Sequence, residues 1–282
     1  MARFYPALFV FLWSTGFIGA KYGLPYAQPL SFLLLRYLLV IVLMGGAALV
    51  AGAQWPRSVR AWVHLAVAGI LMQGIYLGGV FLAIKQGLPA GMVSLLVGLQ
   101  PLLTALLAIA VLGEAVRSRQ WLGLVLGITG TALVLSGRIE SGFALTGVVP
   151  ALCALLGITL GALYQKRFCP HFDWRSGSVI QFSAAALVTL PFALMFEGFH
   201  VQLTGEFIFA LAWLVLVLSV GAISLLNHLI RHGSAVNVAS LFYLVPPVTA
   251  LIAGAMFDER LSVVSLMGLV VAVTGVALVR KT

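Results

Sequence analysis

The sequence repeats one pattern of residues at an offset of about 145 positions. A proline, a threonine, a glutamate and two glycines recur in the same order and with the same spacing. The matched pairs are Pro101 and Pro246, Thr104 and Thr249, Glu114 and Glu259, Gly123 and Gly268, and Gly130 and Gly275. A repeat of this length restricts the fold to two equivalent halves, which we place at residues 1–137 and 143–282.

Each half is too apolar for a water-soluble fold. The chain is 62% hydrophobic and 8% charged, whereas soluble domains carry about 25% charged residues. Nearly the whole length divides into apolar runs of roughly 20 residues, the length that an α-helix needs to cross a bilayer. We predict an all-α integral membrane protein with ten transmembrane helices at 4–21, 31–51, 62–84, 91–112, 120–136, 146–166, 176–196, 207–228, 234–256 and 262–280.

The basic residues between these runs indicate how the helices are oriented. If the N-terminus is cytoplasmic, eleven Lys and Arg residues face the cytoplasm and four face outward, with Arg36 inside a span. The cytoplasmic set is Arg3, Arg57, Arg60, Arg117, Arg119, Lys166, Arg167, Arg175, Arg231, Arg280 and Lys281, and the outer set is Lys21, Lys85, Arg138 and Arg260. By the positive-inside rule, both termini are predicted to be cytoplasmic. Because each half has five helices, the second half must enter the membrane in the opposite direction, which makes the repeat inverted.

Several stretches resemble the drug/metabolite transporter superfamily, specifically two EamA-type domains in tandem. The most specific are the Pro–Thr–Ala–Leu…Glu helix ends at 101–114 and 246–259, each followed by a Gly-rich helix at 120–136 or 262–280. The segments 12–17 and 33–37 also resemble the first two helices of that family. The resemblance implies a ten-helix carrier of the bacterial inner membrane that moves small metabolites, often outward. Among the branches of the superfamily, the chain most resembles bacterial amino-acid exporters of the YddG type.

Uncharged polar side chains at the predicted membrane depth indicate a candidate cavity, because such groups are costly in hydrocarbon. We expect helices one, three and four and their repeat partners six, eight and nine to line it. The candidate cavity residues are Trp13, Ser14, Gln73, Tyr76, Ser94, Gln100, Thr159, Tyr164, Ser224, Asn227, Ser240 and Tyr243. The alternative is that these side chains form hydrogen bonds between helices or fill the packing, as they do in many membrane proteins.

Prolines fall near the middle of the fourth and ninth predicted helices, at Pro101 and at Pro246 and Pro247. Each proline removes a backbone donor and frees the carbonyl four residues earlier, which kinks a helix. Kinks at the same place in both halves suit a gate beside a binding site, although packing kinks are also common in membrane helices.

The charged residues near the spans argue against proton coupling. No acidic residue is predicted near the middle of a span, whereas proton antiporters use a carboxylate within the membrane. Glu114 and Glu259 lie at helix ends and are interpreted as interfacial anchors or caps. Arg36 is expected to snorkel outward or to pair with an outer acid, and the alternative is that it attracts a substrate carboxylate.

Motifs of ATP hydrolysis, zinc proteolysis and serine hydrolysis are absent from the sequence. It contains no Walker motif, HExxH motif or nucleophile elbow, and its two cysteines, Cys153 and Cys169, are too few for a structural zinc site. The formal charge of +9 is scattered between apolar runs, which does not predict a nucleic-acid surface. We therefore expect no enzymatic activity, cofactor, metal or nucleic-acid partner. The expected partners are the lipid bilayer and a small-molecule substrate, and a monomer is sufficient because one chain holds both halves.

Together these features predict a secondary transporter that works by alternating access through a central cavity. Uncharged polar groups in an apolar wall favour neutral or zwitterionic metabolites, first among them amino acids, including aromatic and hydrophobic ones. Without a titratable group at mid-depth, we expect facilitated export and not proton-coupled export. The alternatives are a carrier of another solute, such as a purine, a sugar conjugate or a drug cation, and a channel.

Overall fold

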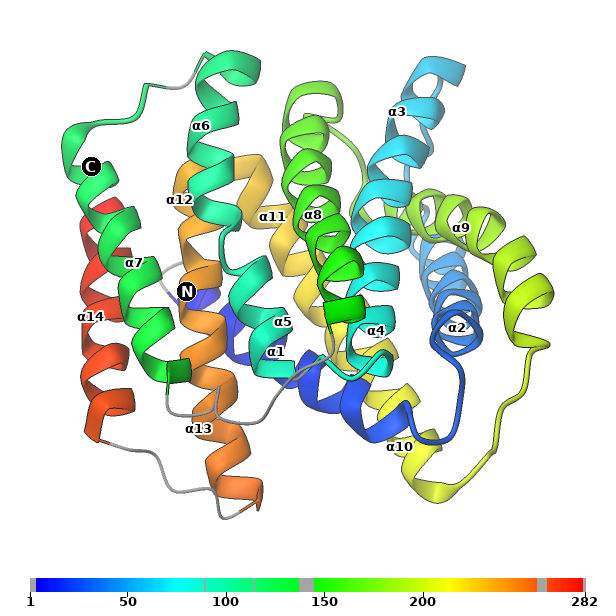
Figure 1. The fold of residues 1–282 in the computed structure, drawn as a ribbon. Helices are drawn as coiled ribbons and strands as arrows, with labels where there is room; N and C mark the ends of the chain where they lie inside the picture. The colour runs from blue at the N-terminus through cyan, green and yellow to red at the C-terminus, as the bar shows by residue number, and fades with distance from the viewer. Residues whose placement is uncertain (1–3, 89, 114, 137–144, 258–262, 281–282) are drawn as a thin grey trace.

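The computed structural model describes residues 4–88, 90–113, 115–136, 145–257 and 263–280. Every regular element in these ranges is a helix (Figure 1). The one β-type contact among them is an isolated antiparallel bridge between Ala27 and Val201. Within the described residues, the all-α prediction is therefore confirmed.

The helices follow one another with short connections. In the first half they are α1 (Tyr5–Gly23), α2 (Pro29–Val50), α3 (Val59–Gly69), η2 (Ile70–Ile75), α4 (Tyr76–Lys85), α5 (Ala90–Val97), α6 (Gln100–Leu112) and α7 (Ser118–Ser136). In the second half they are η3 (Leu145–Gly147), α8 (Val148–Phe168), α9 (Trp174–Phe192), η4 (Ala193–Glu197), α10 (Gly205–Trp213), η5 (Leu214–Ala222), α11 (Ile223–His232), α12 (Ala235–Ser240), η6 (Leu241–Leu244), α13 (Val245–Phe257) and α14 (Val263–Arg280). The elements η2, η4 and η5 are π-helical, and η3 and η6 are 3₁₀-helical.

Short polar loops determine where several helices begin. Ser58, Asp173, Thr204 and Ser234 each precede a helix and accept a hydrogen bond from a backbone amide in its first turn. Each side chain satisfies one of the amides that the start of a helix leaves without a partner. The observed helix bounds stay close to the predicted ranges, and the largest change extends the span predicted at 207–228 to His232.

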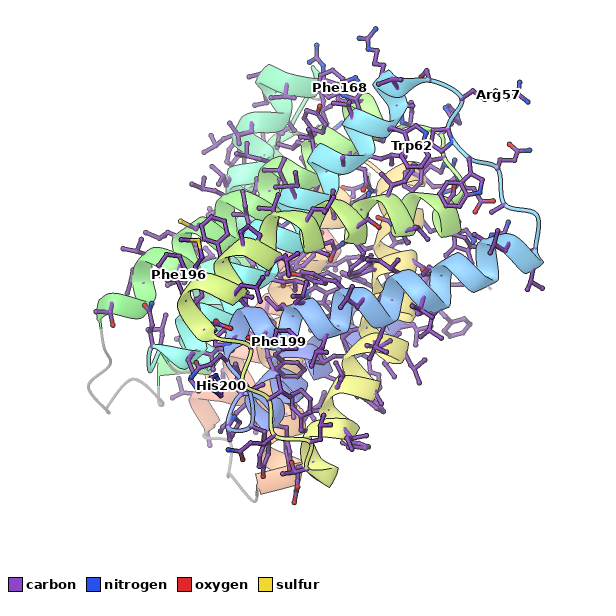
Figure 2. The ribbon with its side chains drawn as sticks, turned by 90° about the vertical axis from the view of Figure 1, so that its right-hand side faces the viewer. Arg57, Trp62, Phe168, Phe196, Phe199 and His200 are labelled. Atoms are coloured by element: carbon purple, nitrogen blue, oxygen red, sulfur yellow. The ribbon has the colours of Figure 1, made fainter. Side chains whose placement is uncertain are left out.

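The long helices and the surface around them are those of an integral membrane protein. Five described helices are long and apolar enough to cross a bilayer: Pro29–Val50, Val59–Lys85, Val148–Phe168, Trp174–Glu197 and Gly205–His232. Large apolar side chains such as Val42, Leu187 and Val270 lie on the outside with about 70% of their surface exposed, as lipid-facing residues do. In Figure 2, Arg57, Trp62 and Phe168 lie toward one end of the molecule, and Phe199 and His200 lie further toward the other. Trp62 is of the residue type that is enriched at membrane interfaces.

Helices α2 and α9 form an antiparallel pair at one side of the molecule (Figure 1). At one end, the Glu197 carboxylate accepts hydrogen bonds from the backbone amides of Leu30 and Ser31 at 2.9 and 2.8 Å and from the Ser31 hydroxyl at 2.8 Å. At the other end, the Ser176 hydroxyl donates to the carbonyl of Gln54 at 2.6 Å. The start of α2 is thus bound to Glu197, which follows α9, and the start of α9 is bound to Gln54, which follows α2.

Helices α7 and α14 pack through a glycine seam at the opposite side of the molecule, formed by Gly123, Gly127, Gly130, Gly268 and Gly275 (Figure 1). A Cβ atom added to Gly123 would lie 2.5 Å from the carbonyl oxygen of Gly275. One added to Gly130 would lie 2.6 Å from the carbonyl oxygen of Gly268. These glycines allow the two helices to approach closely, because a side chain would force the two backbones apart.

Both proline-containing segments are interrupted at the prolines. Pro101 lies in the first turn of α6, after a break at residues 98–99 that separates it from α5. Pro246 and Pro247 lie in the first turn of α13, after the 3₁₀ segment η6. The Tyr243 carbonyl, four residues before Pro247, lies 3.2 Å from the Thr131 hydroxyl, which it shares with the Gly127 carbonyl at 2.9 Å. A neighbouring helix therefore offers a shared donor to a carbonyl that the proline frees, which helps an interrupted helix in an apolar surrounding. Glu114 and Glu259 lie outside the described residues.

Candidate substrate cavity

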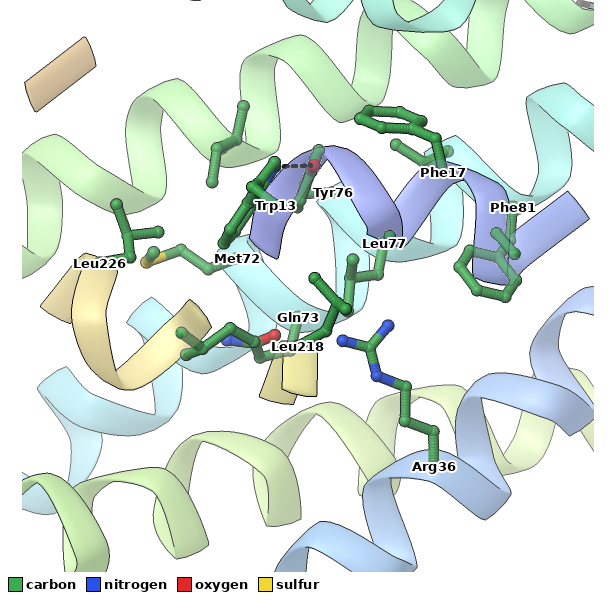
Figure 3. Close-up of a pocket in the computed structure, with 15 residues that line it drawn as sticks. Trp13, Phe17, Arg36, Met72, Gln73, Tyr76, Leu77, Phe81, Leu218 and Leu226 are labelled. Carbon is green, nitrogen blue, oxygen red and sulfur yellow. Dashed lines mark hydrogen bonds between the residues drawn. The ribbon is translucent and has the colours of Figure 1, made fainter. Parts of the chain in front are cut away.

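A buried cavity of about 40 Å³ lies between α1, α2, α8 and the two composite helices α3–η2–α4 and α10–η5–α11. Its wall is mainly apolar, with Phe17, Met72, Leu77, Phe81, Leu218 and Leu226 among its residues. Its polar side chains are Trp13, Arg36, Gln73 and Tyr76 (Figure 3). Three of these four, Trp13, Gln73 and Tyr76, are residues that the sequence predicted for the cavity.

Two aromatic side chains form one wall of the cavity. The Trp13 indole Nε1 donates a hydrogen bond to the Tyr76 hydroxyl at 3.2 Å, and their rings are nearly parallel with centroids 6.1 Å apart (Figure 3). Trp13 also contacts Phe242 edge to face at 5.3 Å and Phe9 at 5.1 Å. Aromatic pairs in these arrangements are mutually stabilising. The cluster therefore provides a fixed apolar surface from α1, α4 and η6.

Gln73 reaches the cavity from the π-helical segment η2. Its side chain is 1% exposed, and its carbonyl oxygen Oε1 has no hydrogen-bond partner. The Gln73 backbone carbonyl accepts a hydrogen bond from the Tyr37 hydroxyl at 2.5 Å, which fixes this turn against α2. A buried amide oxygen without a donor costs about 1–3 kcal/mol, so the cavity offers an acceptor that a bound donor would satisfy.

Arg36 corrects an expectation from the sequence. Its side chain is 3% exposed and points into the cavity (Figure 3), so it does not snorkel to the membrane surface. Its Nε atom donates to the Ser219 hydroxyl at 2.8 Å, and among the described residues no ion pair involves Arg36. The Glu197 carboxylate, an acid placed on the outer side by the predicted topology, binds the first turn of α2 and not Arg36. Arg36 instead contacts Ser219 of η5 inside the molecule, which its position along the chain does not reveal.

The π-helical segments η2 and η5 fall at equivalent positions of the sequence repeat. At the repeat offset of about 145 residues, Ile70–Ile75 corresponds to 215–220, which lies within Leu214–Ala222. Gln73 lies in the first segment, and Leu218 and Ser219 lie in the second. A π-helical turn widens the helix and re-aims its side chains, and such turns are frequent at functional sites.

Three of the candidate residues satisfy local backbone groups. The Ser14 hydroxyl contacts the carbonyls of Val10 and Val245 at 2.7 and 3.2 Å. The hydroxyls of Thr159 and Ser240 donate to backbone carbonyls of their own helices at 2.7 and 2.8 Å. These contacts match the alternative interpretation, in which polar residues act as hydrogen bonds within and between helices.

The remaining candidates of the fourth, sixth and ninth predicted helices are not among the residues that line the central cavity. Tyr164 contacts the His64 ring nitrogen Nδ1 at 2.7 Å, and its ring packs at a tilt against Phe168. Tyr243 packs its ring against Gly127, and Ser94 is buried in α5. Gln100 lines a separate void of about 10 Å³.

A second group of polar residues lies between α8, α9 and α11. The Gln181 amide donates to the Gln165 carbonyl oxygen at 2.7 Å, and the Gln165 amide donates to the Asn227 carbonyl oxygen at 3.0 Å. Asn227 and Ser224 also line a pocket of about 440 Å³ with Arg231. Sequence reasoning missed Gln165 and Gln181, although both are glutamines within apolar predicted helices and satisfy the criterion that selected Gln73.

The central cavity is small in this conformation. A volume of about 40 Å³ holds a few water molecules, since one water needs about 10–15 Å³ by this measure. Pockets for small organic ligands measure roughly 300–1,000 Å³. Arg36 is the one charged side chain among its lining residues, and the described residues contain no group of three or more His, Cys, Asp or Glu that could hold a metal.

Comparison with known proteins gives one consistent family. The EamA-like transporter family pattern matches residues 3–136 and, a second time, residues 145–281. An uncharacterized transporter of Bacillus subtilis, YvbV, is 28% identical over 97% of this chain and 89% of its own length. A probable amino-acid metabolite efflux pump of Escherichia coli is 26% identical over 95% of this chain and 91% of its own. A solved crystal structure with 22% identity superposes with a TM-score of 0.80 over 98% of this chain and 95% of the other, which shows the same fold.

Proposed function

This chain belongs to the EamA-like transporter family, and we propose that it exports small neutral or zwitterionic metabolites, foremost amino acids. It is an integral membrane transporter. The observation that supports the substrate class is the buried cavity, whose wall joins the Trp13–Tyr76 aromatic pair with the unsatisfied amide oxygen of Gln73. Such a wall suits a ligand with an apolar body and a few hydrogen-bonding groups.

We propose ten membrane-spanning stretches in two inverted halves, with both termini in the cytoplasm of a bacterial cell. Reciprocal contacts support the inversion. Gly123 contacts Gly275, and Gly130 contacts Gly268. In the repeat, Gly268 is the equivalent of Gly123 and Gly275 is the equivalent of Gly130, so the two contacts are the same contact made twice. Two copies related by a two-fold axis contact each other in this reciprocal way. Thiol labelling of single cysteines introduced at Gln86 and Arg57 tests the orientation, and labelling of the second from outside the cell would contradict it.

The proposed transport mechanism is alternating access around the central cavity. The cavity volume of about 40 Å³ is well below the roughly 300–1,000 Å³ of pockets for small organic ligands, so the substrate fits only after helices separate. The interruptions before Pro101 and before Pro246 and Pro247 are the proposed bending points, since they lie beside the cavity helices and recur in both halves. No acidic side chain is among the residues that line the cavity, so we propose facilitated movement down the substrate gradient by a monomer.

Counterflow in proteoliposomes tests this function. Purified protein is reconstituted with unlabelled amino acid inside, and uptake of labelled amino acids from a panel is measured. We expect saturable uptake that internal substrate accelerates, which a channel does not show. Failure of the whole amino-acid panel, together with counterflow of another solute, would refute the substrate class and retain the carrier. Accumulation driven by an imposed pH gradient alone would refute facilitated movement.

A matched pair of variants links the flux to the cavity. Gln73→Leu replaces the amide with an apolar side chain that is one atom shorter, while the Tyr37 contact to the Gln73 backbone carbonyl remains. We expect it to lower the apparent affinity about 10-fold, the loss for one hydrogen bond of about 1.4 kcal/mol. The control is Gln202→Leu in an exposed loop, which should transport as the wild type does.

A further inference from the structure

We propose that Arg36 binds the carboxylate of the transported molecule, so that the substrates are monocarboxylates with an apolar body, such as α-amino acids. The inference rests on the proposed transport function and adds a charged subsite to it. Its basis is the placement of a buried guanidinium, with no ion-pair partner among the described residues, in the wall of the central cavity.

The buried charge of Arg36 requires compensation. A guanidinium taken out of water costs several kcal/mol unless an opposite charge or a set of hydrogen bonds replaces its hydration. Within the described residues it makes one hydrogen bond, from Nε to the Ser219 hydroxyl at 2.8 Å. Glu197 is not available to it, because that carboxylate already accepts three hydrogen bonds at the start of α2. The site therefore favours an anion supplied from outside the chain.

The hydrogen bond to Ser219 also fixes how the guanidinium is presented. It engages Nε and leaves both terminal nitrogens to the cavity side (Figure 3). Ser219 is itself held in η5 by donating to the Leu214 carbonyl at 3.1 Å. A planar fork whose orientation is fixed in this way matches the two oxygens of a carboxylate.

The rest of the cavity distinguishes a zwitterion from a multiply charged anion. Arg36 is the one charged side chain in its wall, so a phosphate dianion would leave an unbalanced negative charge in a low-dielectric site. The unsatisfied Oε1 of Gln73 is an acceptor for an ammonium group. Arg36 and Gln73 thus provide complementary sites for the two charged groups of an amino acid, and the Trp13–Tyr76 wall contacts its side chain.

A purely structural role for Arg36, as a brace between α2 and η5, predicts a different result. A brace affects all ligands equally, whereas a carboxylate subsite changes the preference among them. The test therefore compares one amino acid with its amide, its decarboxylated amine and its 2-hydroxy acid as inhibitors of counterflow. For leucine these are leucinamide, 3-methylbutylamine and 2-hydroxy-4-methylpentanoate.

The variants are Arg36→Gln, Arg36→Lys and Ser219→Ala, with Arg57→Gln as the control at an exposed arginine. For the wild type we expect leucine to inhibit about 10- to 100-fold more strongly than leucinamide, the range for a charge-assisted pair. Arg36→Gln should abolish this preference, and Arg36→Lys should restore part of it. Ser219→Ala, which keeps the charge and frees its orientation, should reduce the preference without abolishing it.

Each outcome decides the inference. Suppose that the wild type shows counterflow of amino acids. An unchanged preference for the acid over the amide in Arg36→Gln then overturns the subsite and leaves the proposed function intact.

If the wild type moves no amino acid, the proposed function fails, and thermal-shift binding of 2-hydroxy-4-methylpentanoate then decides the subsite. Stabilisation of the wild type but not of Arg36→Gln supports it, and equal or absent stabilisation overturns it. If Arg36→Gln does not fold, the Ser219→Ala preference decides.

Discussion

The substitution Gly130→Ala tests how closely α7 and α14 must approach. The added Cβ atom would lie 2.3 Å from the amide nitrogen of Ala272 and 2.6 Å from the carbonyl oxygen of Gly268. Both neighbours are backbone atoms that no rotamer change can move. Ordinary contacts begin near 3.4 Å, so the helices must separate by about 1 Å, a gap that forfeits roughly a quarter to a half of each local dispersion contact.

Overpacking of this kind costs about 1–3 kcal/mol. We expect the apparent melting temperature of the purified protein in detergent to fall by roughly 2–8 °C, measured from the loss of monodisperse protein on heating. The control is Gly46→Ala on the exposed face of α2, where an added Cβ meets nothing within 4 Å. That variant should be unchanged or slightly more stable, because alanine is the better helix former. Equal melting temperatures for the two variants would refute the close-packing argument.

Two further results are expected outside the cavity. Glu197→Gln replaces one of the two carboxylate oxygens that bind the amides of Leu30 and Ser31 with a hydrogen-bond donor. The lost hydrogen bond should cost about 1–3 kcal/mol of stability. Faster hydrogen exchange at these two amides checks this prediction, and unchanged exchange contradicts it. Hydrogen bonds from the Arg175 side chain lower the pKa of Asp173. The ionised carboxylate therefore stabilises the fold at pH values above the unfolded-state pKa near 4. This stabilisation is lost as the pH falls through the lower folded-state pKa. Asp173→Asn should therefore melt below the wild type at pH 7 and converge with it toward pH 3, and a constant difference would show that the carboxylate charge is not involved.

Helix positions could be predicted from the sequence because hydrocarbon imposes one length and one composition on every span. The predicted range 62–84 became Val59–Lys85, and 176–196 became Trp174–Glu197. The contacts that each polar side chain makes could not be predicted in the same way. Tyr76 and Tyr164 are the same residue type at predicted membrane depth, yet Tyr76 lines the cavity and Tyr164 contacts His64.

The least predictable part of the site is its backbone. The π-helical turns η2 and η5 re-aim Gln73 and Ser219, and apolar periodicity gives no signal for them because nearly every position in these helices is apolar. Arg36 is difficult for a related reason. Its distance from the helix end suggests snorkelling, and only the three-dimensional placement of Ser219 explains why the guanidinium stays inside.

The glycine seam has a consequence for how the protein is made. Helix α7 ends at Ser136, and its partner α14, which begins at Val263, is the last described helix of the chain. At translation rates of about 5–20 residues per second, roughly 7–30 s separate the end of α7 from the end of α14. During that interval the backbone of the α7 glycine face has lipid or a membrane chaperone as its neighbour in place of α14. Completion of the first half therefore depends on the last helix, so truncations that remove α14 should expose a newly made chain to membrane proteases even though the central cavity is intact.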